Sequence, residues 1–530
     1  MRLRSVKLSL ILFCFITIFL IVEGALILHH HASAQNVSAN LNDLYSSTSD
    51  TIISSALVES ERVQDIKELL GKANNGRSII KIAHNYNLNG EVISLPPNCV
   101  LCFSGGVISN GTLKGNFTCI DAPISVIFGK DIVLEGDWNV DYAYPEWFGA
   151  KGDGKTDDRV PIQLSLKFFI NTKLLPHRYL INSYQVLNNK KYGLIIPPHH
   201  NLESSGFFDL QNTALVIGNK EVEVGIGVYS YVILKNISLL GHHYNSHIGG
   251  ATGVVGSGTI GIGNADYSDW ARDLDFEKVV CQAFDTGYKL MSFSVKFQAV
   301  WSRLCNVGFH MYSTKVGGIK NGSAGTTISM INCYADHIYS CGYLIEHEWY
   351  SQLLNCSCDR VAEKSSMGNP TTEEIINSCA YKLSNSSNCT MISCGAESTY
   401  KVLDITGCNN TILSMQCYPV DPPVVRKGNP IDLIVIGDFG KTKTQNNFLK
   451  NVQVNRTYNQ YKCNITATGN EISHIDNIIT TTERENTKGG FDAKPSAKEM
   501  GEGALYYDTT NKRMILSNGN RWVNLDGSPL

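Results

Sequence analysis

The sequence predicts an all-β fold in which short parallel strands stack into a solenoid, and three observations support this prediction. The chain has 530 residues, more than a single hydrophobic core usually organises. Amphipathic helical stretches are few, and short apolar or β-branched runs alternate with polar turn residues. A cysteine-centred segment recurs with a period of about 23 residues. Repeats of this length are typical of solenoid proteins.

The N-terminus predicts an export signal over residues 1–34. Basic residues precede the apolar run from Leu8 to Val22, and the small residues Ala32-Ser33-Ala34 provide a cleavage site. The alternative is that the apolar run extends to Leu28 and is kept as a membrane anchor. Both alternatives predict a secreted, periplasmic or cell-surface protein.

Two segments are expected before the solenoid: a helical or linker segment over residues 35–79 and a small leading β-region over residues 80–140. The sequence YPEWFGAKGDGKTDD follows, and its Asp157 or Asp158 can cap a helix. That helix has an apolar stripe, formed by Val160, Leu164 and Phe168 with Ile162 and Phe169 beside it. We expect it to close the N-terminal end of the solenoid, which otherwise exposes a sheet edge.

The solenoid itself is predicted over residues 141–470. Its repeat cysteines are Cys281, Cys305, Cys333, Cys356, Cys394 and Cys417. Their separations are 24, 28, 23, 38 and 23 residues, and the fourth becomes 23 when a 15-residue insertion near residues 364–378 is looped out. Equivalent residues of stacked coils lie about 4.8 Å apart. We therefore expect these cysteines in one inward column, as small buried hydrophobes that need no disulfide bonds.

The C-terminal part changes character. Residues 471–488 are expected to be a linker, and residues 489–530 a β-hairpin module. In the segment GALYYDTTNKRMILSNGNRWVNLDG, apolar and polar residues alternate around the turn Asn518-Gly519. This combination of alternation and Asn-Gly is a hairpin signal.

The motif FGAKGDGKTDD resembles the entry motif of the pectate-lyase-like superfamily, which includes rhamnogalacturonases, epimerases and phage tailspikes. Upstream, LNGEVISLPPNCVLCFSGGVISNGTLKGNFTCI is similar to the leading β-region of gut Bacteroidetes members, and the coils with CYAD, CSCD and CGAE resemble tailspike coils. The resemblance covers roughly residues 80–425. It implies a right-handed parallel β-helix, with an N-terminal capping helix and a small C-terminal β-module, that engages a polysaccharide, and it allows a homotrimer. The NTD, GHG and RIK set of the polygalacturonases is absent from the sequence.

Three carboxylates are the candidate catalytic residues: Asp336, Asp359 and Glu397 each follow a repeat cysteine by three residues. If the cysteines stack, these carboxylates stack as well, at about 5 Å spacing. Like charges so close should raise at least one pKa or bind a cation. A carboxyl pair suits a glycosidase and a Ca²⁺ bridge suits a lyase, so no cofactor is required and Ca²⁺ is an allowed ligand. The alternative is that these side chains bind turn amides at a solvated edge.

The candidate substrate-binding residues are Trp301, Arg303, Tyr343, Trp349 and Tyr350. Arg303 can bind a sugar acid, and the aromatic rings offer faces on which sugars stack. The alternatives are a salt-bridged coil residue for Arg303 and ordinary core positions for the aromatic residues.

Composition restricts the partners. Charged residues make up 18% of the chain and the formal net charge is -3, so no basic field is present to hold nucleic acid. Membrane contact is expected only through the N-terminal anchor. Two function classes remain: a polysaccharide-active enzyme of the lyase, glycoside hydrolase or epimerase class, and a non-catalytic glycan-binding or tailspike-derived adhesion protein.

Overall fold

The structure is a computed structural model. Up to residue 437 it describes residues 57–58, 66–71, 78–205, 214–247, 249–266, 270–313, 325–362, 371–419 and 431–437. Beyond residue 437 it describes residues 447–450, 452–454, 461–466, 475–476, 488–489, 496–497, 502–508, 510–524 and 528–530. The predicted export signal and its anchor alternative lie outside the described residues. In the described part, no helix has the length and apolar character needed to span a bilayer. The described residues form two compact units, one within residues 1–123 and 133–139 and the other within residues 124–132 and 140–530.

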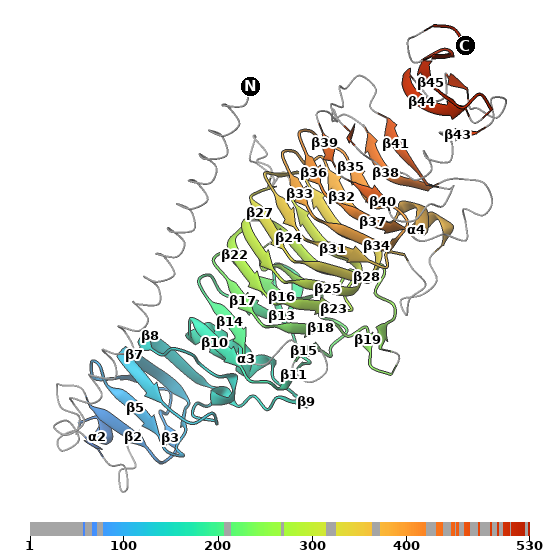
Figure 1. The fold of residues 1–530 in the computed structure, drawn as a ribbon. Helices are drawn as coiled ribbons and strands as arrows, with labels where there is room; N and C mark the ends of the chain where they lie inside the picture. Colours follow the sequence, from blue (N-terminus) through green and yellow to red (C-terminus); the bar gives the residue numbers. More distant parts are fainter. Residues whose placement is uncertain are drawn as a thin grey trace, which may run out of the picture. The chain divides into compact units, whose positions relative to one another are not determined.

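The first unit is a small sheet of mostly parallel strands (Figure 1). Ile79, Val100 and Cys119 occupy the same position on three successive strands, so this region is itself a short stack of coils. Its elements are β1 (Leu57–Val58), α2 (Ile66–Gly71), β2 (Ile79–Ile82), β3 (Tyr86–Asn87), β4 (Val92–Ser94), β5 (Val100–Phe103), β6 (Ile108–Ser109), β7 (Gly111–Asp121) and β8 (Ile132–Asn139).

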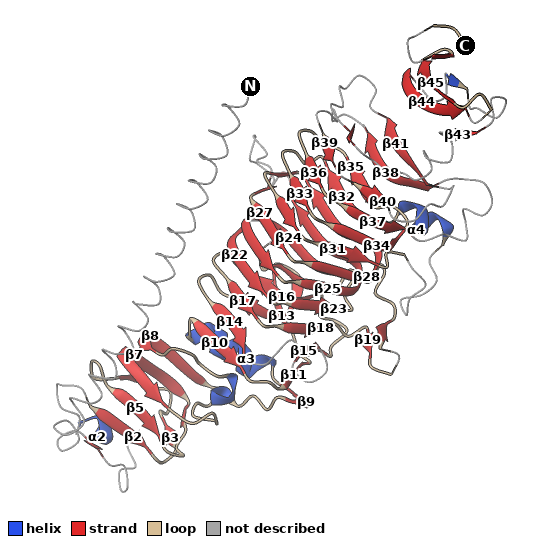
Figure 2. Ribbon diagram, in the orientation of Figure 1, coloured by secondary structure: helices blue, strands red, loops and turns tan. Residues whose placement is uncertain are grey.

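The second unit confirms the predicted solenoid, because strands one coil apart pair in parallel along three strand columns (Figures 1 and 2). The first column contains β10 (Asn171–Leu174), β14 (Asn201–Ser204), β17 (Ile233–Lys235), β22 (Ala271–Glu277), the end of β24 (Thr286–Gln298), β27 (Ile328–Ile331), β30 (Gln352–Leu354), β33 (Thr390–Ile392), β36 (Thr411–Leu413), β39 (Phe448–Lys450) and β42 (Ile475–Asp476).

The second column contains β9 (Asp153–Asp157), β11 (Arg178–Ile181), β15 (Ala214–Ile217), β18 (Ser238–Leu240), β23 (Val280–Gln282), the beginnings of β25 (Trp301–Tyr312) and β28 (Tyr334–Glu346), β31 (Ser357–Asp359), β34 (Gly395–Thr399), β37 (Gln416–Pro419) and β40 (Gln453–Val454). The third contains β13 (Lys190–Ile196), β16 (Val224–Val228), β21 (Ile260–Asn264), the beginning of β24, the ends of β25 and β28, β32 (Cys379–Ser384), β35 (Leu403–Ile405), β38 (Ile431–Gly437) and β41 (Tyr461–Thr466). Strand β12 (Gln185–Leu187) pairs antiparallel with β13.

The predicted capping helix is α3 (Arg159–Phe168), preceded by the 3-10 turn η1 (Pro145–Phe148). The expected apolar stripe is wrong, since Val160, Leu164 and Phe168 are only half-buried. The buried face is rotated toward Ile162 and Leu166, which join the solenoid core. The Asp158 carboxylate does not cap the helix and instead accepts hydrogen bonds from the backbone of the preceding Gly-rich turn.

The predicted single cysteine column is also wrong, because it splits into two. One stack, at the corner before the second column, contains Cys333, Cys356 and Cys394. The backbone carbonyl of each accepts a hydrogen bond from a backbone amide of the next coil. Cys281 and Cys417 lie two positions further on, in an inward column completed by Ser302, Ala335, Cys358 and Ala396. Cys305 falls at a register shift and pairs with Ile338. The cysteines whose side chains the structure describes are all free thiols.

An aromatic stack fills the interior of the third column. The rings of Tyr288, Phe309, Tyr343 and Tyr381 are nearly parallel, with successive centroids 4.9, 4.8 and 5.0 Å apart. All four side chains are fully buried. Each coil therefore contributes one ring to the core, at the spacing set by the strand pairing.

Shorter elements lie on the turns and at the C-terminus. The predicted insertion contains α4 (Thr372–Asn377), which Thr371 and Glu374 cap reciprocally. Two small strand pairs are β19 (Tyr244–Asn245) with β20 (Gly250–Ala251), and β26 (Gly325–Thr326) with β29 (Glu348–Trp349). The C-terminal strands β43 (Lys488–Gly489), β44 (Glu502–Asp508), β45 (Arg513–Asn518) and β46 (Trp522–Asn524) form one sheet, in which Trp522 packs on Tyr506.

Candidate functional site

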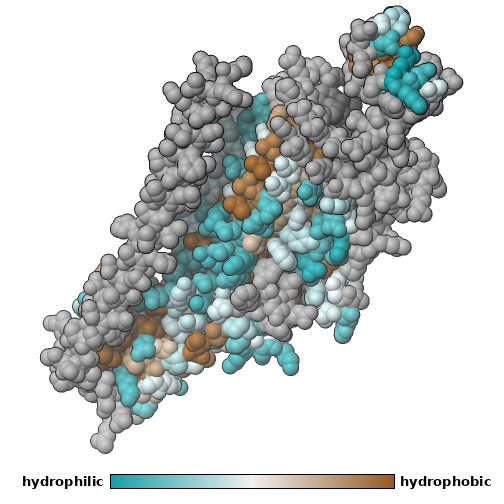
Figure 3. Space-filling view, in the orientation of Figure 1, coloured by the Kyte–Doolittle hydropathy of each residue, from teal (hydrophilic) through white to brown (hydrophobic). Residues whose placement is uncertain are grey.

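The three candidate carboxylates stack as predicted, on successive coils of the second column. Asp336 pairs in register with Asp359, and Asp359 with Glu397. Arg303 occupies the same position one coil before Asp336. We call Arg303, Asp336, Asp359 and Glu397 the carboxylate column. Hydrophilic residues cover much of the described solenoid surface visible in Figure 3.

Asp336 is held as a carboxylate. It is 5% exposed, and the Arg303 Nε donates to its Oδ2 at 2.8 Å. The Nδ1 of His337 lies 2.8 Å from its Oδ1, and Arg360 Nη1 lies 4.0 Å from the same oxygen. Burial raises the pKa of Asp336, but the hydrogen bonds and charges of His337 and Arg303 outweigh it and the pKa is lowered. Asp336 therefore fixes charge on this flank and does not supply a proton.

Asp359, one coil further on, is in the opposite electrostatic setting. It is half-buried and accepts a hydrogen bond of 2.6 Å from the Tyr334 hydroxyl. Burial raises its pKa, the Tyr334 hydrogen bond opposes this, and the charges of Glu397 and Asp336 add to the increase, so the pKa is raised. Burial and the same hydrogen bond raise the pKa of Tyr334, which keeps its hydroxyl a donor. Asp359 is thus the member of the column suited to donate a proton.

The remaining carboxyl and one predicted aromatic residue complete this flank. Glu397 is exposed, and it is the next residue in the column after Asp359. Trp301 is half-buried and meets the Tyr334 ring edge-on, with the centroids 5.3 Å apart. The carboxylate column therefore has an aromatic border on its N-terminal side.

The other predicted substrate-binding residues do not converge on this flank. Tyr343 is fully buried in the aromatic stack and its hydroxyl donates to the Ser357 carbonyl at 3.0 Å, so its prediction as a sugar contact is wrong. Trp349 and Tyr350 are 45% and 59% exposed, but they lie on the turn that follows the third column. Arg303 is in place, although its guanidinium is engaged by Asp336.

Sequence reasoning missed three residues that shape the column: Tyr334, His337 and Arg360. Each is a direct sequence neighbour of a candidate carboxylate or lies two residues from it. His337 and Arg360 have left-handed backbone conformations, with φ of 52° and 56°, and so turn the chain directly after the carboxylates. Their Nε2 and Nη1 atoms lie 2.8 Å apart. The sequence signal that could have identified His337 and Arg360 is the polar residue that directly follows each candidate carboxylate.

Ca²⁺ binding by the column stays a prediction, and the described side chains give Ca²⁺ few free oxygens. No group of three or more His, Cys, Asp and Glu side chains gathers for a metal within the residues that the structure describes. Both Asp336 oxygens are taken, and Arg303 and Arg360 bring positive charge to this carboxylate. Asp359 and Glu397 alone offer fewer oxygens than the about six to eight that Ca²⁺ takes.

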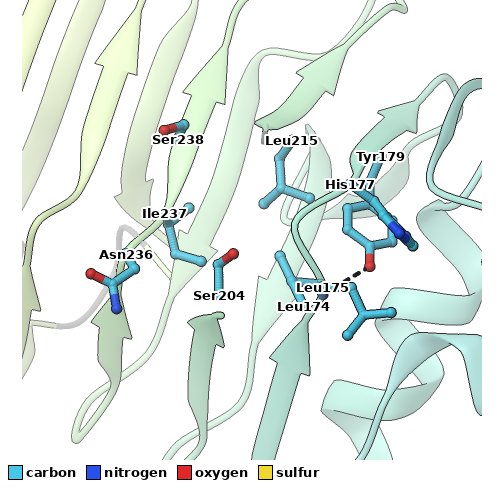
Figure 4. A pocket seen from close by; sticks show the side chains of 9 residues that line it. All are labelled: Leu174, Leu175, His177, Tyr179, Ser204, Leu215, Asn236, Ile237 and Ser238. Atoms are coloured by element: carbon cyan, nitrogen blue, oxygen red, sulfur yellow. Dashed lines mark hydrogen bonds between the residues drawn. The ribbon is translucent and has the colours of Figure 1, made fainter. Parts of the chain in front are cut away.

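Two hollows in the second unit differ in character. The one shown in Figure 4 is an interior space of about 10 Å³ between Leu174, Tyr179 and Leu215, where the Tyr179 hydroxyl accepts from the Leu175 amide. It is too small for a sugar. The other, about 410 Å³, lies between α4 and the strand corner at Asn306 and Tyr339, three residues beyond Arg303 and Asp336 in β25 and β28. A hollow of this size has room for a saccharide unit.

Comparison with known proteins found no matching family model and no matching curated protein. Among solved structures, the chain is similar to tailspike protein 2 of Escherichia coli O157:H7 bacteriophage CAB120, with 17% identity, a TM-score of 0.41, and coverage of 60% of this chain and 38% of that one. It is also similar to the A-module of the Azotobacter vinelandii mannuronan C-5 epimerase AlgE4, with 13% identity, a TM-score of 0.35, and coverage of 63% and 98%.

A third similar structure is Pantoea stewartii WceF, a glycan biofilm modifying enzyme with a tailspike-like parallel β-helix, with 10% identity, a TM-score of 0.32, and coverage of 62% of this chain and 39% of that one. At 10–17% identity, these likenesses concern the fold alone. These likenesses are too distant to carry an argument about activity. Function therefore rests on the residues of the carboxylate column.

Proposed function

We propose that this chain is a polysaccharide-active β-helix protein that works along the carboxylate column. The observation that carries the proposal is the contrast between Asp336 and Asp359, which are neighbours in register but have pKa values shifted in opposite directions. The raised pKa of Asp359 suits a general acid, whereas the lowered pKa of Asp336 keeps a fixed negative charge beside it.

Within the lyase, hydrolase and epimerase classes, this arrangement best supports glycoside hydrolysis. Asp359 would protonate the leaving glycosidic oxygen, and Glu397 on the next coil would act as the second carboxyl, either attacking the sugar or activating water. Asp336, held by Arg303 and His337, would keep the flank charged and ordered. Trp301 and the hollow beside α4 would receive neighbouring sugar units.

The test is a screen of the purified chain against acidic and neutral glycans, with detection of new reducing ends and of unsaturated uronate absorbance. Reducing ends without absorbance indicate hydrolysis. Asp359→Asn should then slow cleavage by about a hundredfold or more, because it removes the proton donor and keeps the size of the side chain. The matched control is Asp275→Asn, which makes the same change on the first column, where Asp275 pairs with Lys296.

A fully active Asp359→Asn variant would contradict the assignment. Unsaturated products would show that the chain is a lyase and not a hydrolase. If the parent binds a glycan and cleaves none, the second candidate function applies, a glycan-binding or adhesion protein. The observation that favours this candidate is the pairing of Asp336 with Arg303 and His337, which has the form of a structural ion pair.

We also propose export to the periplasm, cell surface or medium, and a homotrimer as the assembly. Both rest on the sequence: the first on residues 1–34 and the second on the resemblance to tailspikes. Cell fractionation with N-terminal sequencing tests the first, and the molar mass from light scattering tests the second. A mature protein that still begins at Met1 would support the anchor alternative.

A further inference from the structure

A second polar cluster lies on the outward side of the third column, away from the residues assigned above. Lys289, His310, Leu344, Lys382 and Asp404 occupy the same position on five successive coils. Tyr312 and Glu346 follow His310 and Leu344 by two residues, so they lie on the same outward side, and they pair in register with each other. The inward residues between these positions belong to the core, so the side chains of this cluster lie on the outside of the solenoid.

The acidic side chains of this region already have partners. Glu346 Oε2 lies 2.6 Å from His310 Nε2, and this hydrogen bond, opposed by burial, leaves the pKa of Glu346 lowered. Asp404 pairs with Lys401 at 3.7 Å. Asp285 accepts hydrogen bonds of 3.2 and 3.1 Å from two backbone amides of the 256–258 turn.

Two lysines of the cluster have no such partner. Lys289 and Lys382 are half-buried, and neither has a carboxylate oxygen within 4.0 Å in the part of the chain that the structure describes. The Lys289 ammonium lies 5.9 Å from the centre of the Tyr312 ring. Burial and the nearby positive charge of Lys190 lower the pKa of Lys289. The charges of Asp285 and Glu346 oppose this change without contacting the Lys289 ammonium, and Glu346 also interacts electrostatically with Lys382. An anionic ligand in direct contact would offset the cost of partial desolvation that these more distant carboxylates leave.

We propose that this cluster binds the acidic groups of a polysaccharide, either carboxylates or sulfates, through Lys289 and Lys382. The two lysines are three coils apart, roughly 14 Å at about 4.8 Å per coil. A small free anion contacts one of them at a time, whereas an extended acidic chain lying along the solenoid axis contacts both.

Aromatic groups around the cluster suit the same ligand. Tyr312 is half-buried, with its ring centroid 5.0 Å from that of His310. The exposed Trp349 and Tyr350 follow Glu346 on the next turn. Sugar rings stack on such faces, so charge and stacking together favour a saccharide over an inorganic anion. This inference narrows the substrate class of the proposed function, and it is tested by binding instead of cleavage.

The experiment measures binding of the full chain to polygalacturonate, to its methyl-esterified form, to dextran sulfate and to dextran, by isothermal titration calorimetry. We expect tighter binding of a charged polymer than of its neutral counterpart, and the preferred charged polymer identifies carboxylate or sulfate as the ligand group. Lys289→Met and Lys382→Met should each weaken that binding about tenfold, because each removes a charged contact but keeps the aliphatic stem. The matched control is Lys296→Met, whose lysine pairs with Asp275 at 3.6 Å on the first column and whose loss should leave binding unchanged.

Equal affinity for charged and neutral polymers, binding to none of the four, or unchanged affinity in both lysine variants would overturn the site. The binding experiment can fail while the cleavage experiment succeeds, and the reverse. Cleavage with binding that does not depend on charge leaves the proposed function standing and removes this site. Charge-dependent binding that the lysine variants lose, without cleavage of any glycan, keeps the site and removes the catalytic assignment.

Discussion

Replacing Arg303 by methionine should destabilise the coils around Asp336. Asp336 is 5% exposed and receives the Arg303 Nε at 2.8 Å. The substitution keeps most of the aliphatic stem and removes the guanidinium. The carboxylate then retains His337 at 2.8 Å and the more distant Arg360 at 4.0 Å.

The expected magnitude follows from these contacts. Removing one member of a buried ion pair costs about 3–5 kcal/mol when nothing replaces it, and a charged hydrogen bond contributes about 1.5–3 kcal/mol. Since His337 and Arg360 remain and the Arg303 side chain is 31% exposed, we expect the free energy of unfolding to fall by about 2 kcal/mol. A double-mutant cycle with Asp336→Asn should give a coupling energy of about 1–2 kcal/mol.

The assay is urea unfolding followed by tryptophan fluorescence, with the m-values compared because solenoids can unfold in parts. The pKa of Asp336 is lowered in the folded chain. Its contribution is therefore complete above the ordinary aspartate pKa of about 3.9 and is lost as the pH falls through the lower folded value. The coupling should shrink below about pH 4. A coupling under about 0.5 kcal/mol at pH 7 would refute the reasoning.

Other side chains give separate tests. Glu348 is fully buried, its carboxyl oxygens have no hydrogen-bond partner among the residues that the structure describes, and burial raises its pKa to about 9. Stability should therefore fall as the pH rises from about 4.3 toward that value, and Glu348→Gln should remove this slope in urea titrations. Gly342→Ala places a Cβ 2.2 Å from the Cys358 sulfur and should cost about 1–3 kcal/mol, whereas Gly395→Ala, whose Cβ has 3.8 Å to its nearest neighbour, should leave the urea midpoint unchanged. Tyr343→Ala should cost about 3–5 kcal/mol by opening the aromatic stack, and a loss below about 1 kcal/mol in urea unfolding would contradict its core role.

The sequence alone determined the solenoid, a helix that follows Asp158 and the stacking of Asp336, Asp359 and Glu397. These features depend on local spacing. Each carboxylate keeps a constant offset from its own cysteine, so any register that aligns Cys333, Cys356 and Cys394 also aligns the carboxylates. The prediction of the column held although Cys281, Cys305 and Cys417 did not belong to the same stack.

Only the tertiary structure decided which side chains face inward and what each one contacts. A register shift between Cys305 and Val307 changes which residues of β25 face inward. The alternation of apolar and polar residues in the sequence does not predict where such a shift occurs. Tyr343, in β28, lies in the core because its ring stacks between those of Phe309 and Tyr381 on the neighbouring coils. The contacts between Arg303 and Asp336 and between His310 and Glu346 join residues 33 and 36 positions apart. Coil stacking brings them together, and variable turn lengths hide that pairing in the sequence.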